Sequence, residues 1–346
     1  MQIKTLNNIE SFLQIKEAWR KIYLQGTYSV FQSFELNYYS WKHEMEADKS
    51  NKLAVTLITK EDNILAIFPF YVDNNKQLRF INDLHFDFCD FISIESINFF
   101  EVYNYLKKEI NFKSINLINI KKEANIYKAI SDLNITNKVV KLISEYSTVC
   151  LDQGNFPYNV KHYRSHEKHR INKAIRTNKD KRSLILDSLK SSFPKKEILF
   201  LRDRMIRLGL RKESFLTNQR LLLIESLFNS GIIILNLTRD TERINCINIL
   251  FRNSSNEFIF WIDLFDDSKT INISSYINFM KFYSLKRSIN INFGRGRYFY
   301  KESNFSPKFH NLYQICIFSN KWQKIIFYII DNLSVLLKRI YKKFKK

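Results

Sequence analysis

Blocks of apolar residues with helical or strand periodicity alternate through the first half of the chain. Spacings of three and four residues indicate helices, and runs rich in Ile, Val and Phe between polar turns indicate strands. In chain order, the pattern predicts helices over 12–24 and 34–45, hairpin strands over 53–59 and 64–72, a strand over 78–81, a helix near 102–108 and strands over 115–120 and 139–151.

The second half repeats this order of elements. The prediction there is a helix over 160–176, a strand over 184–186, helices over 195–211 and 218–229, strands over 232–237, 244–251 and 258–264, a helix over 273–286 and a strand over 289–291. Each half thus reads as helices, antiparallel strands, a helix and a further strand. This pattern predicts the α+β class and a duplicated architecture.

The last predicted strand leads into an unusual segment, Asn-Phe-Gly-Arg-Gly-Arg-Tyr-Phe-Tyr-Lys at residues 292–301. Gly294 and Gly296 allow positive φ or a close approach of the backbone to a ligand. Two arginines and a lysine suit phosphate or carboxylate, and two tyrosines can donate a proton. A basic surface turn needs the glycines but not this concentration of charge.

This segment resembles the Asp-Phe-x-Arg-Gly-x-x-x-Tyr-Lys signature of the CelD-like acyltransferases, a branch of the GNAT superfamily related to the FemAB peptidyltransferases. The matching residues are Phe293, Arg295, Gly296, Tyr300 and Lys301, with Asn292 where the family usually has Asp. Segments near 19–41, 64–70, 87–91 and 168–176 also resemble the family in order and spacing, so the resemblance covers about residues 10 to 318.

The resemblance implies two tandem GNAT-like domains, each a mostly antiparallel mixed sheet flanked by helices. We expect an N-terminal domain over 1–155, a C-terminal domain with the signature over 156–319, and a basic amphipathic helix over 320–346. The implied activity is transfer of an acyl group, with acyl-CoA as co-substrate, to an amine such as an amino sugar in bacterial polysaccharide or cell-envelope biosynthesis.

Acyl transfer needs a proton donor for the oxyanion or leaving group and cations for anionic parts of the substrates. By the resemblance, Tyr300 and Lys301 are expected to be catalytic, with Arg295 and Arg297 binding substrate. Gly294, Gly296 and Ser274 are expected to bind the cofactor; no metal is expected. Residues 272–274, Asn-Ile-Ser, replace the family's Pro-Gly before the long helix, and no glycine-rich phosphate loop occurs in either half.

Two carboxylates add to this set. Asp90 lies in a mostly apolar segment, where a raised pKa suits it to accept a proton from an amine, or it caps a turn. Asp263 follows an apolar strand and is expected to bind the acceptor amine. The alternative there is purely structural, with Asp267 or Ser268 capping the next helix.

Composition and charge limit the partners. With 55 Lys and Arg against 34 Asp and Glu, the net charge is +21, which favours anionic partners such as phosphorylated cofactors, nucleic acid or an anionic membrane. The four cysteines lack zinc-like spacing, and Lys and Arg surround the three histidines at 162, 166 and 169, so neither set predicts a metal site. No signal peptide or spanning segment is recognised, so the sequence predicts a cytoplasmic protein.

The C-terminal segment, residues 322–346, has apolar residues at helical spacing and a basic end. It fits an interfacial helix at the inner face of the membrane, or a terminal helix packed on the second domain.

Two alternatives to the CoA-dependent enzyme stay open. One is a FemAB-like transferase using aminoacyl-tRNA, with a basic helix over 161–182 contacting the tRNA; the other is a non-catalytic scaffold for an anionic polymer or membrane.

Overall fold

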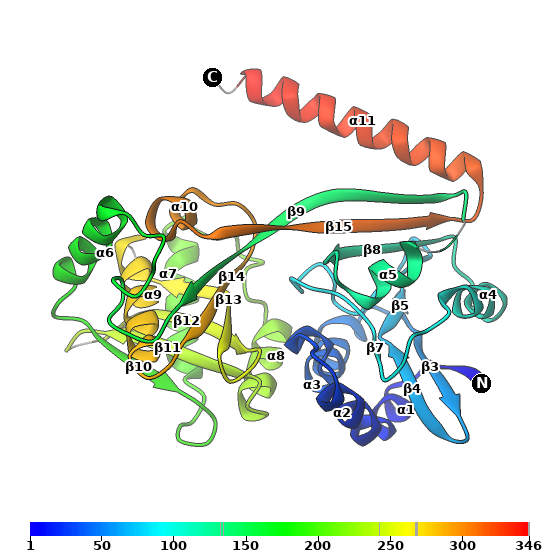
Figure 1. Ribbon diagram of the computed structural model, residues 1–346, viewed down its shortest axis with the longest axis horizontal. Coiled ribbons are helices and arrows are strands. Elements are labelled where there is room, and N and C mark those ends of the chain that lie inside the picture. Colours follow the sequence, from blue (N-terminus) through cyan, green and yellow to red (C-terminus); the bar gives the residue numbers. More distant parts are fainter. Residues whose placement is uncertain (132, 134, 242, 267–268, 345–346) are drawn as a thin grey trace. The chain divides into compact units, whose positions relative to one another are not determined.

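The computed structural model describes residues 1–131, 133, 135–241, 243–266 and 269–344, and its side chains outside 269, 334–336 and 338–344. The chain forms two compact units (Figure 1). Unit 1 consists of Met1–Gly26, Asp48–Ile143 and Leu312–Lys346, and unit 2 of Thr27–Ala47 and Ser144–Asn311. Both combine helices with mainly antiparallel strands, which confirms the predicted α+β class.

Unit 1 contains a small antiparallel sheet of order β1-β3-β4-β7 and a second set of strands in the order β15-β8-β6-β5-β2. Its elements are β1 (Gln2–Leu6), α1 (Ile9–Gln14), α2 (Lys16–Gln25), β2 (Lys52–Leu53), β3 (Val55–Lys60), β4 (Asn63–Phe68), β5 (Phe70–Val72), β6 (Gln77–Phe80), β7 (Ile92–Ser93), α4 (Phe99–Glu109), β8 (Ser114–Ile120), α5 (Asn125–Ser131), the first part of β9 (Lys138–Leu151), most of β15 (Lys308–Phe318) and α11 (Lys321–Phe344).

Unit 2 has strands in the order β10-β11-β12-β13-β14-β9. Its elements are η1 (Val30–Gln32), α3 (Phe34–Ser40), η2 (Trp41–Met45), the second part of β9, α6 (Ser165–Thr177), β10 (Arg182–Leu186), α7 (Lys195–Arg207), α8 (Asn218–Asn229), β11 (Ile233–Arg239), β12 (Ile244–Arg252), β13 (Glu257–Phe265), α9 (Lys269–Ser284), β14 (Ile289–Arg295), α10 (Phe299–Phe305) and the start of β15.

The two halves of the chain share one plan, as the sequence predicts. In each, a strand and helices precede antiparallel strands, and a helix then leads to a strand that runs parallel to one of them. These parallel pairs are β6 with β8 and β13 with β14. The architecture is therefore a tandem GNAT-like fold.

The final strand of each half contributes to the other unit. Residues 144–151 of β9 belong to unit 2 and pair with β14, while residues 312–318 of β15 belong to unit 1 and pair with β8. The units therefore differ from the continuous ranges 1–155 and 156–319 expected from the sequence. Apolar alternation identifies a strand but does not specify its partner.

The predicted strand over 64–72 is two strands, β4 and β5, which belong to different sheets. The break falls at Pro69, which has no N–H to donate to a ladder. One apolar run of the sequence therefore supplies a strand to each of the two sheets of unit 1.

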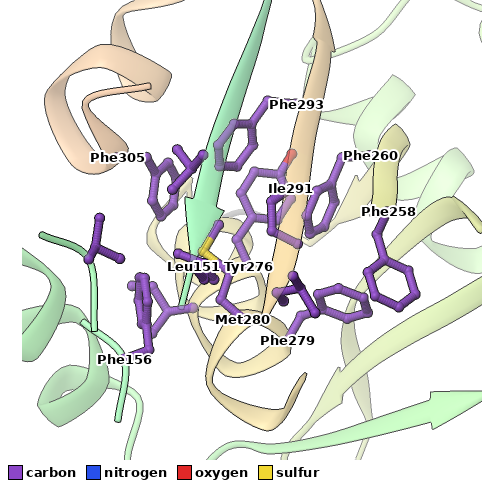
Figure 2. Close-up of a cluster of buried hydrophobic side chains, with 14 of the residues drawn as sticks. Leu151, Phe156, Phe258, Phe260, Tyr276, Phe279, Met280, Ile291, Phe293 and Phe305 are labelled. Atoms are coloured by element: carbon purple, nitrogen blue, oxygen red, sulfur yellow. The ribbon is translucent and has the colours of Figure 1, made fainter. Parts of the chain in front are cut away.

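The core of unit 2 is aromatic and surrounds α9 (Figure 2). The ring of Tyr276 on α9 packs against those of Phe260 on β13 and Phe293 on β14, with centroid separations of 4.1 and 5.8 Å, and the two Phe rings are 5.9 Å apart. Phe305 of α10 stacks on Phe293 at 4.9 Å. The strand that carries the signature is therefore fixed by the packing of its own aromatic residue.

Candidate functional site

The signature segment forms the end of β14, a glycine turn and the start of α10. Gly294 and Gly296 have φ of +68° and +96°, a conformation that side-chain-bearing residues rarely adopt. The Asn292 side-chain oxygen accepts the Gly294 N–H at 2.9 Å, and the Gly296 N–H donates to the Glu145 carbonyl at 2.7 Å. The positive φ angles explain why glycine occupies both positions, and the two hydrogen bonds hold the turn in this conformation.

Lys301 stabilises this turn from inside. Its side chain is buried, with 1% of the residue exposed, and Nζ donates to the carbonyls of Gly294, Arg295 and Gly296 at 3.2, 3.3 and 3.1 Å. The resemblance predicts a catalytic role for Lys301. The structure instead directs it toward three backbone carbonyls, so its geometry is that of a positioning residue.

The two arginines of the signature have different surroundings. Arg295 ends β14 opposite Tyr146 of β9 and is partly buried. Arg297 is exposed, donates from Nε to Glu302 at 2.5 Å, and has its guanidinium 3.7 Å from the Glu145 carboxylate. Two carboxylates thus balance the charge of Arg297, and its predicted role in substrate binding stays a prediction.

The pairing of β13 with β14 ends before the glycine turn. Their parallel ladder has three pairs and ends at Ile259 with Asn292, although β13 continues to Phe265. This divergence places Asp263, on the separated part of β13, near Tyr276 of α9. The opening between the strands is therefore occupied by polar groups as well as aromatic rings.

These groups form a chain of hydroxyls ending on a carboxylate. The Tyr276 hydroxyl donates to Asp263 Oδ2, and the Tyr300 ring lies beside that of Tyr276, with centroids 6.4 Å apart. Because Tyr276 has a single hydroxyl proton and donates it to the carboxylate, its oxygen is left to accept a proton from a neighbouring hydroxyl such as that of Tyr300.

A buried amide network fixes the carboxylate. Asn248 Nδ2, on β12, donates to Asp263 Oδ1 at 2.8 Å and to Asn272 Oδ1 at 2.7 Å. The Asn248 oxygen accepts from Asn236 Nδ2 at 3.1 Å and from Ser275 Oγ at 2.6 Å. Fully buried amides are costly unless hydrogen-bonded, so this network determines where Asp263 lies.

Burial controls the ionisation of the three linked groups. It raises the pKa of Tyr300 and of Tyr276, and the negative charge of Asp263 adds to both shifts. Burial also raises the pKa of Asp263, opposed by the hydrogen bonds from Tyr276 and Asn248. At neutral pH both tyrosines therefore keep their protons, and Asp263 is more basic than an exposed carboxylate.

Two exposed groups lie close to this chain. Tyr298, whose side chain is exposed, stacks on Tyr300 with ring centroids 6.0 Å apart. The positive charge of Arg211, in the connection between α7 and α8, lowers the pKa of Asp263 and of Tyr300. Arg211 is an exposed cation.

The sequence predicts Tyr300 and Asp263 as site residues but gives no such indication for Tyr276, Asn248 or Arg211. A signal existed for Asn248, because asparagines interrupt the otherwise apolar strands β11 and β12 at buried positions. Nothing in the pattern separated Tyr276 from the other aromatic residues, or Arg211 from the 54 other basic residues.

Asp90 belongs to unit 1, where its carboxylate binds three backbone N–H groups. They are those of Phe91 at 2.9 Å and of Asn125 and Ile126, at the start of α5, at 2.8 Å each. Burial raises the pKa of Asp90 to about 7 in spite of these bonds. The geometry matches the capping alternative, and the predicted proton-accepting role stays untested.

Ser274 lies within α9 and is 1% exposed. A buried hydroxyl has little surface to offer a ligand. The cofactor-binding role of Ser274 stays a prediction. Asp267 and Ser268, the alternative caps of α9, lie outside the described residues.

A surface cavity of about 450 Å³ lies elsewhere in unit 2, lined by Lys196, Arg239, Asp240 and Arg243 among others. None of the predicted site residues lines it. In the part of the chain that the structure describes, no three His, Cys, Asp or Glu side chains are grouped as metal ligands.

Comparisons with known proteins gave matches only among solved structures. No protein-family model and no curated protein matches the sequence. L-PGS from Bacillus licheniformis is 12% identical with a TM-score of 0.59, over 94% of this chain and 95% of that one. The C-terminal DUF2156 domain of a candidate lysylphosphatidylglycerol synthetase from Agrobacterium fabrum is 11% identical with a TM-score of 0.59, over 92% and 96%.

A conserved protein of unknown function from Bacteroides thetaiotaomicron is 11% identical with a TM-score of 0.55, over 92% of this chain and 100% of that one. Identities this low show a shared fold and nothing finer. The similarity extends over both halves of the chain, so this tandem GNAT-like fold is the one that these structures share.

Proposed function

We propose that the protein is an acyltransferase whose reaction takes place in unit 2, where β13 and β14 separate. The observation that carries this proposal is the placement of Tyr300 beside Tyr276, whose hydroxyl donates to Asp263. It leads from a partly exposed tyrosine of the signature to a partly buried carboxylate of raised pKa. This arrangement suits a reaction that must move one proton away from a nucleophile and return it to a leaving group.

In the proposed reaction, the acceptor amine attacks the carbonyl carbon of the acyl donor. A carbon–nitrogen bond forms, the carbon–oxygen or carbon–sulfur bond to the donor breaks, and one proton passes from the amine to the leaving group. The Tyr300 oxygen takes the amine proton as its own moves to Tyr276 and that of Tyr276 moves to Asp263. The same steps in reverse protonate the leaving group.

The separated strands and the nearby cation supply binding groups. Beyond Ile259, the edge of β13 that faced β14 leaves the ladder, and its peptide groups suit hydrogen bonds to a polar part of the donor. Arg211 suits an anionic part of donor or acceptor. Lys301 acts indirectly, by holding the turn that leads into α10, the helix that carries Tyr300.

Two donors fit this chemistry, and the start of α9 favours an aminoacyl ester over acyl-CoA. A pyrophosphate binds well at a helix N-terminus with free N–H groups and glycines. Here no glycine occurs between Gly231 and Gly294, and the carboxylates of Asp266 and Asp267 precede α9 in the sequence. Negative charge at that position repels a pyrophosphate.

Aminoacyl-tRNA is therefore the donor we favour, and acyl-CoA the second candidate. Two of the structures that share the fold are a protein called L-PGS and a candidate lysylphosphatidylglycerol synthetase, a name that denotes an aminoacylated lipid product. The net charge of +21 also suits tRNA. The acceptor is an amine such as an amino sugar, or a lipid hydroxyl to which the same proton steps apply.

The test is a transfer assay with both donors, lysyl-tRNA and acetyl-CoA, against glucosamine and phosphatidylglycerol vesicles. Tyr300→Phe and Tyr276→Phe each remove one hydroxyl from the relay and should lower kcat by about 100-fold or more. Tyr158→Phe is the matched control, because Tyr158 is an exposed tyrosine of unit 2 away from the relay. Full transfer by Tyr300→Phe would remove the relay from the mechanism. Salt-sensitive tRNA binding without transfer of either acyl group would favour the scaffold instead.

A further inference from the structure

Helix α11 of unit 1 is docked along one side. Phe327 packs against Val139, Cys316 and Phe318 of β9 and β15, with its ring centroid 5.3 Å from that of Phe318. Polar contacts act along the same side of the helix. Lys324 Nζ donates to the Thr136 carbonyl at 2.8 Å, and Asp331 forms an ion pair with Lys141.

The opposite side of α11 is apolar and exposed. Positions three, four and seven apart lie on one face of a helix, and here they are Trp322, Ile326, Ile329, Ile330, Leu333 and Leu337. Trp322, Ile330 and Leu337 are 74%, 61% and 64% exposed. The helix is already attached to unit 1 through Phe327, so this second apolar face needs another partner.

The charges of the segment identify that partner. Residues 321–346 contain eight Lys and Arg and one acidic residue, Asp331, whose charge is paired with Lys141. Six of the eight fall in the last nine residues. A second copy of this helix would bring like charges together, whereas an anionic lipid surface is complementary both to the charges and to the apolar face.

The shape of the helix suits the same partner. Twenty-four residues span about 36 Å at 1.5 Å per residue, enough for a long contact parallel to a bilayer surface. Trp322, at the start of the exposed face, belongs to the residue types enriched at the level of lipid headgroups. No described helix of this chain has the length and apolarity to cross a bilayer.

We propose that α11 binds the surface of an anionic phospholipid bilayer, with the face from Trp322 to Leu337 at the boundary between headgroups and acyl chains. The basic C-terminal residues would contact lipid phosphates. This binding does not rest on the proposed acyl transfer, because it involves the lipid-facing side of α11 and none of the residues of the unit 2 relay.

The test is sedimentation of the full-length protein with sucrose-loaded vesicles. Vesicles of phosphatidylcholine with 30% phosphatidylglycerol are compared with pure phosphatidylcholine. We expect binding to the anionic vesicles to be at least about 30-fold stronger, because each Lys or Arg near an anionic surface contributes about fivefold. Salt at 0.5 M should reduce this difference.

The double variant Ile326→Asp with Ile330→Asp tests the apolar face and should lose about 100-fold or more in binding. Its matched control is Leu24→Asp with Leu189→Asp, since these leucines are 80% and 89% exposed elsewhere and the same two charges are added. The control should stay within about threefold of the wild type. Circular dichroism would verify that both variants are folded.

Three results would overturn the proposal. They are equal loss of binding in the test and control variants, equal binding of wild type to neutral and anionic vesicles, and a dimer in light scattering that Ile326→Asp with Ile330→Asp converts to a monomer. The last result would assign the face to a second copy of the chain.

Discussion

The geometry of Lys301 leads to a prediction that separates a positioning role from direct substrate binding. Replacing Lys301 with Met keeps the aliphatic volume but removes the ammonium from the carbonyls of Gly294, Arg295 and Gly296. Three N–H donors then disappear from three carbonyl oxygens that converge on one point. We expect the variant to lose both stability and activity.

The magnitude follows from the distances and the burial. The three contacts are 3.1 to 3.3 Å long, at the weak end for hydrogen bonds from a charged donor. Taking the lower limit for an unsatisfied buried carbonyl, about 1 kcal/mol each, the loss is about 3 kcal/mol. Release of a buried charge from its desolvated site offsets part of the loss.

Urea unfolding followed by circular dichroism measures this free energy, and two transitions are to be expected from two units. The loss should appear in the transition of unit 2, to which Lys301 belongs. Lys108→Met is the matched control, because Lys108 is 83% exposed and lies 3.7 Å from Glu109. That change should cost less than about 0.5 kcal/mol.

A loss below about 1 kcal/mol in Lys301→Met would refute the reasoning. If such a stable variant were also inactive, Lys301 would act on the substrate, as the signature alone suggests. If it were stable and active, the ammonium would be unnecessary for both the turn and the reaction.

The remaining predictions concern Asp90 and the glycines. Burial raises the folded-state pKa of Asp90 from 3.8 to about 7, so the protonated carboxyl contributes to stability fully below pH about 4, and this contribution is lost as pH rises to about 7. Urea unfolding of the wild type should show this decrease in the free energy of unfolding, and Asp90→Asn should lack it. Gly296→Ala should cost about 2 kcal/mol and lower activity, because φ is +96° and a Cβ would lie 2.6 Å from the Tyr298 ring. Gly209→Ala, with φ of +67° and no atom within 4 Å, should cost only about 1 kcal/mol and leave activity unchanged; equal thermal shifts for the two glycine variants would contradict the argument from Tyr298.

The sequence predicted the order of elements well because burial imposes a period on each of them. The meander of β11, β12 and β13 and the long helix α9 lie within a few residues of the expected ranges. Pairing between distant strands leaves no such period. The exchange of β9 and β15 between the units therefore became visible only in the structure.

The residues of the candidate site divide in the same way, into those that the sequence predicted and those that only the structure showed. Tyr300 and Asp263 were predicted, one from the signature and one from its position on an apolar strand. Tyr276, which joins them, is one aromatic residue among 52 Phe, Tyr and Trp, and its role depends on α9 crossing the point where β13 and β14 separate. A contact between residues that far apart in the chain has no local signature.

Residue chemistry and local periodicity determined, from the sequence alone, the α+β class, the duplicated plan, the glycine turn and the basic amphipathic end. Those properties depend on neighbours within a few positions, which the sequence states directly. The tertiary structure decided which groups meet: it directed Lys301 to backbone carbonyls, placed Asp90 on the N–H groups of α5 and connected Tyr276 to Asp263. The physical reason is that hydrogen bonding and desolvation act over a few ångströms in space, whatever the separation along the chain.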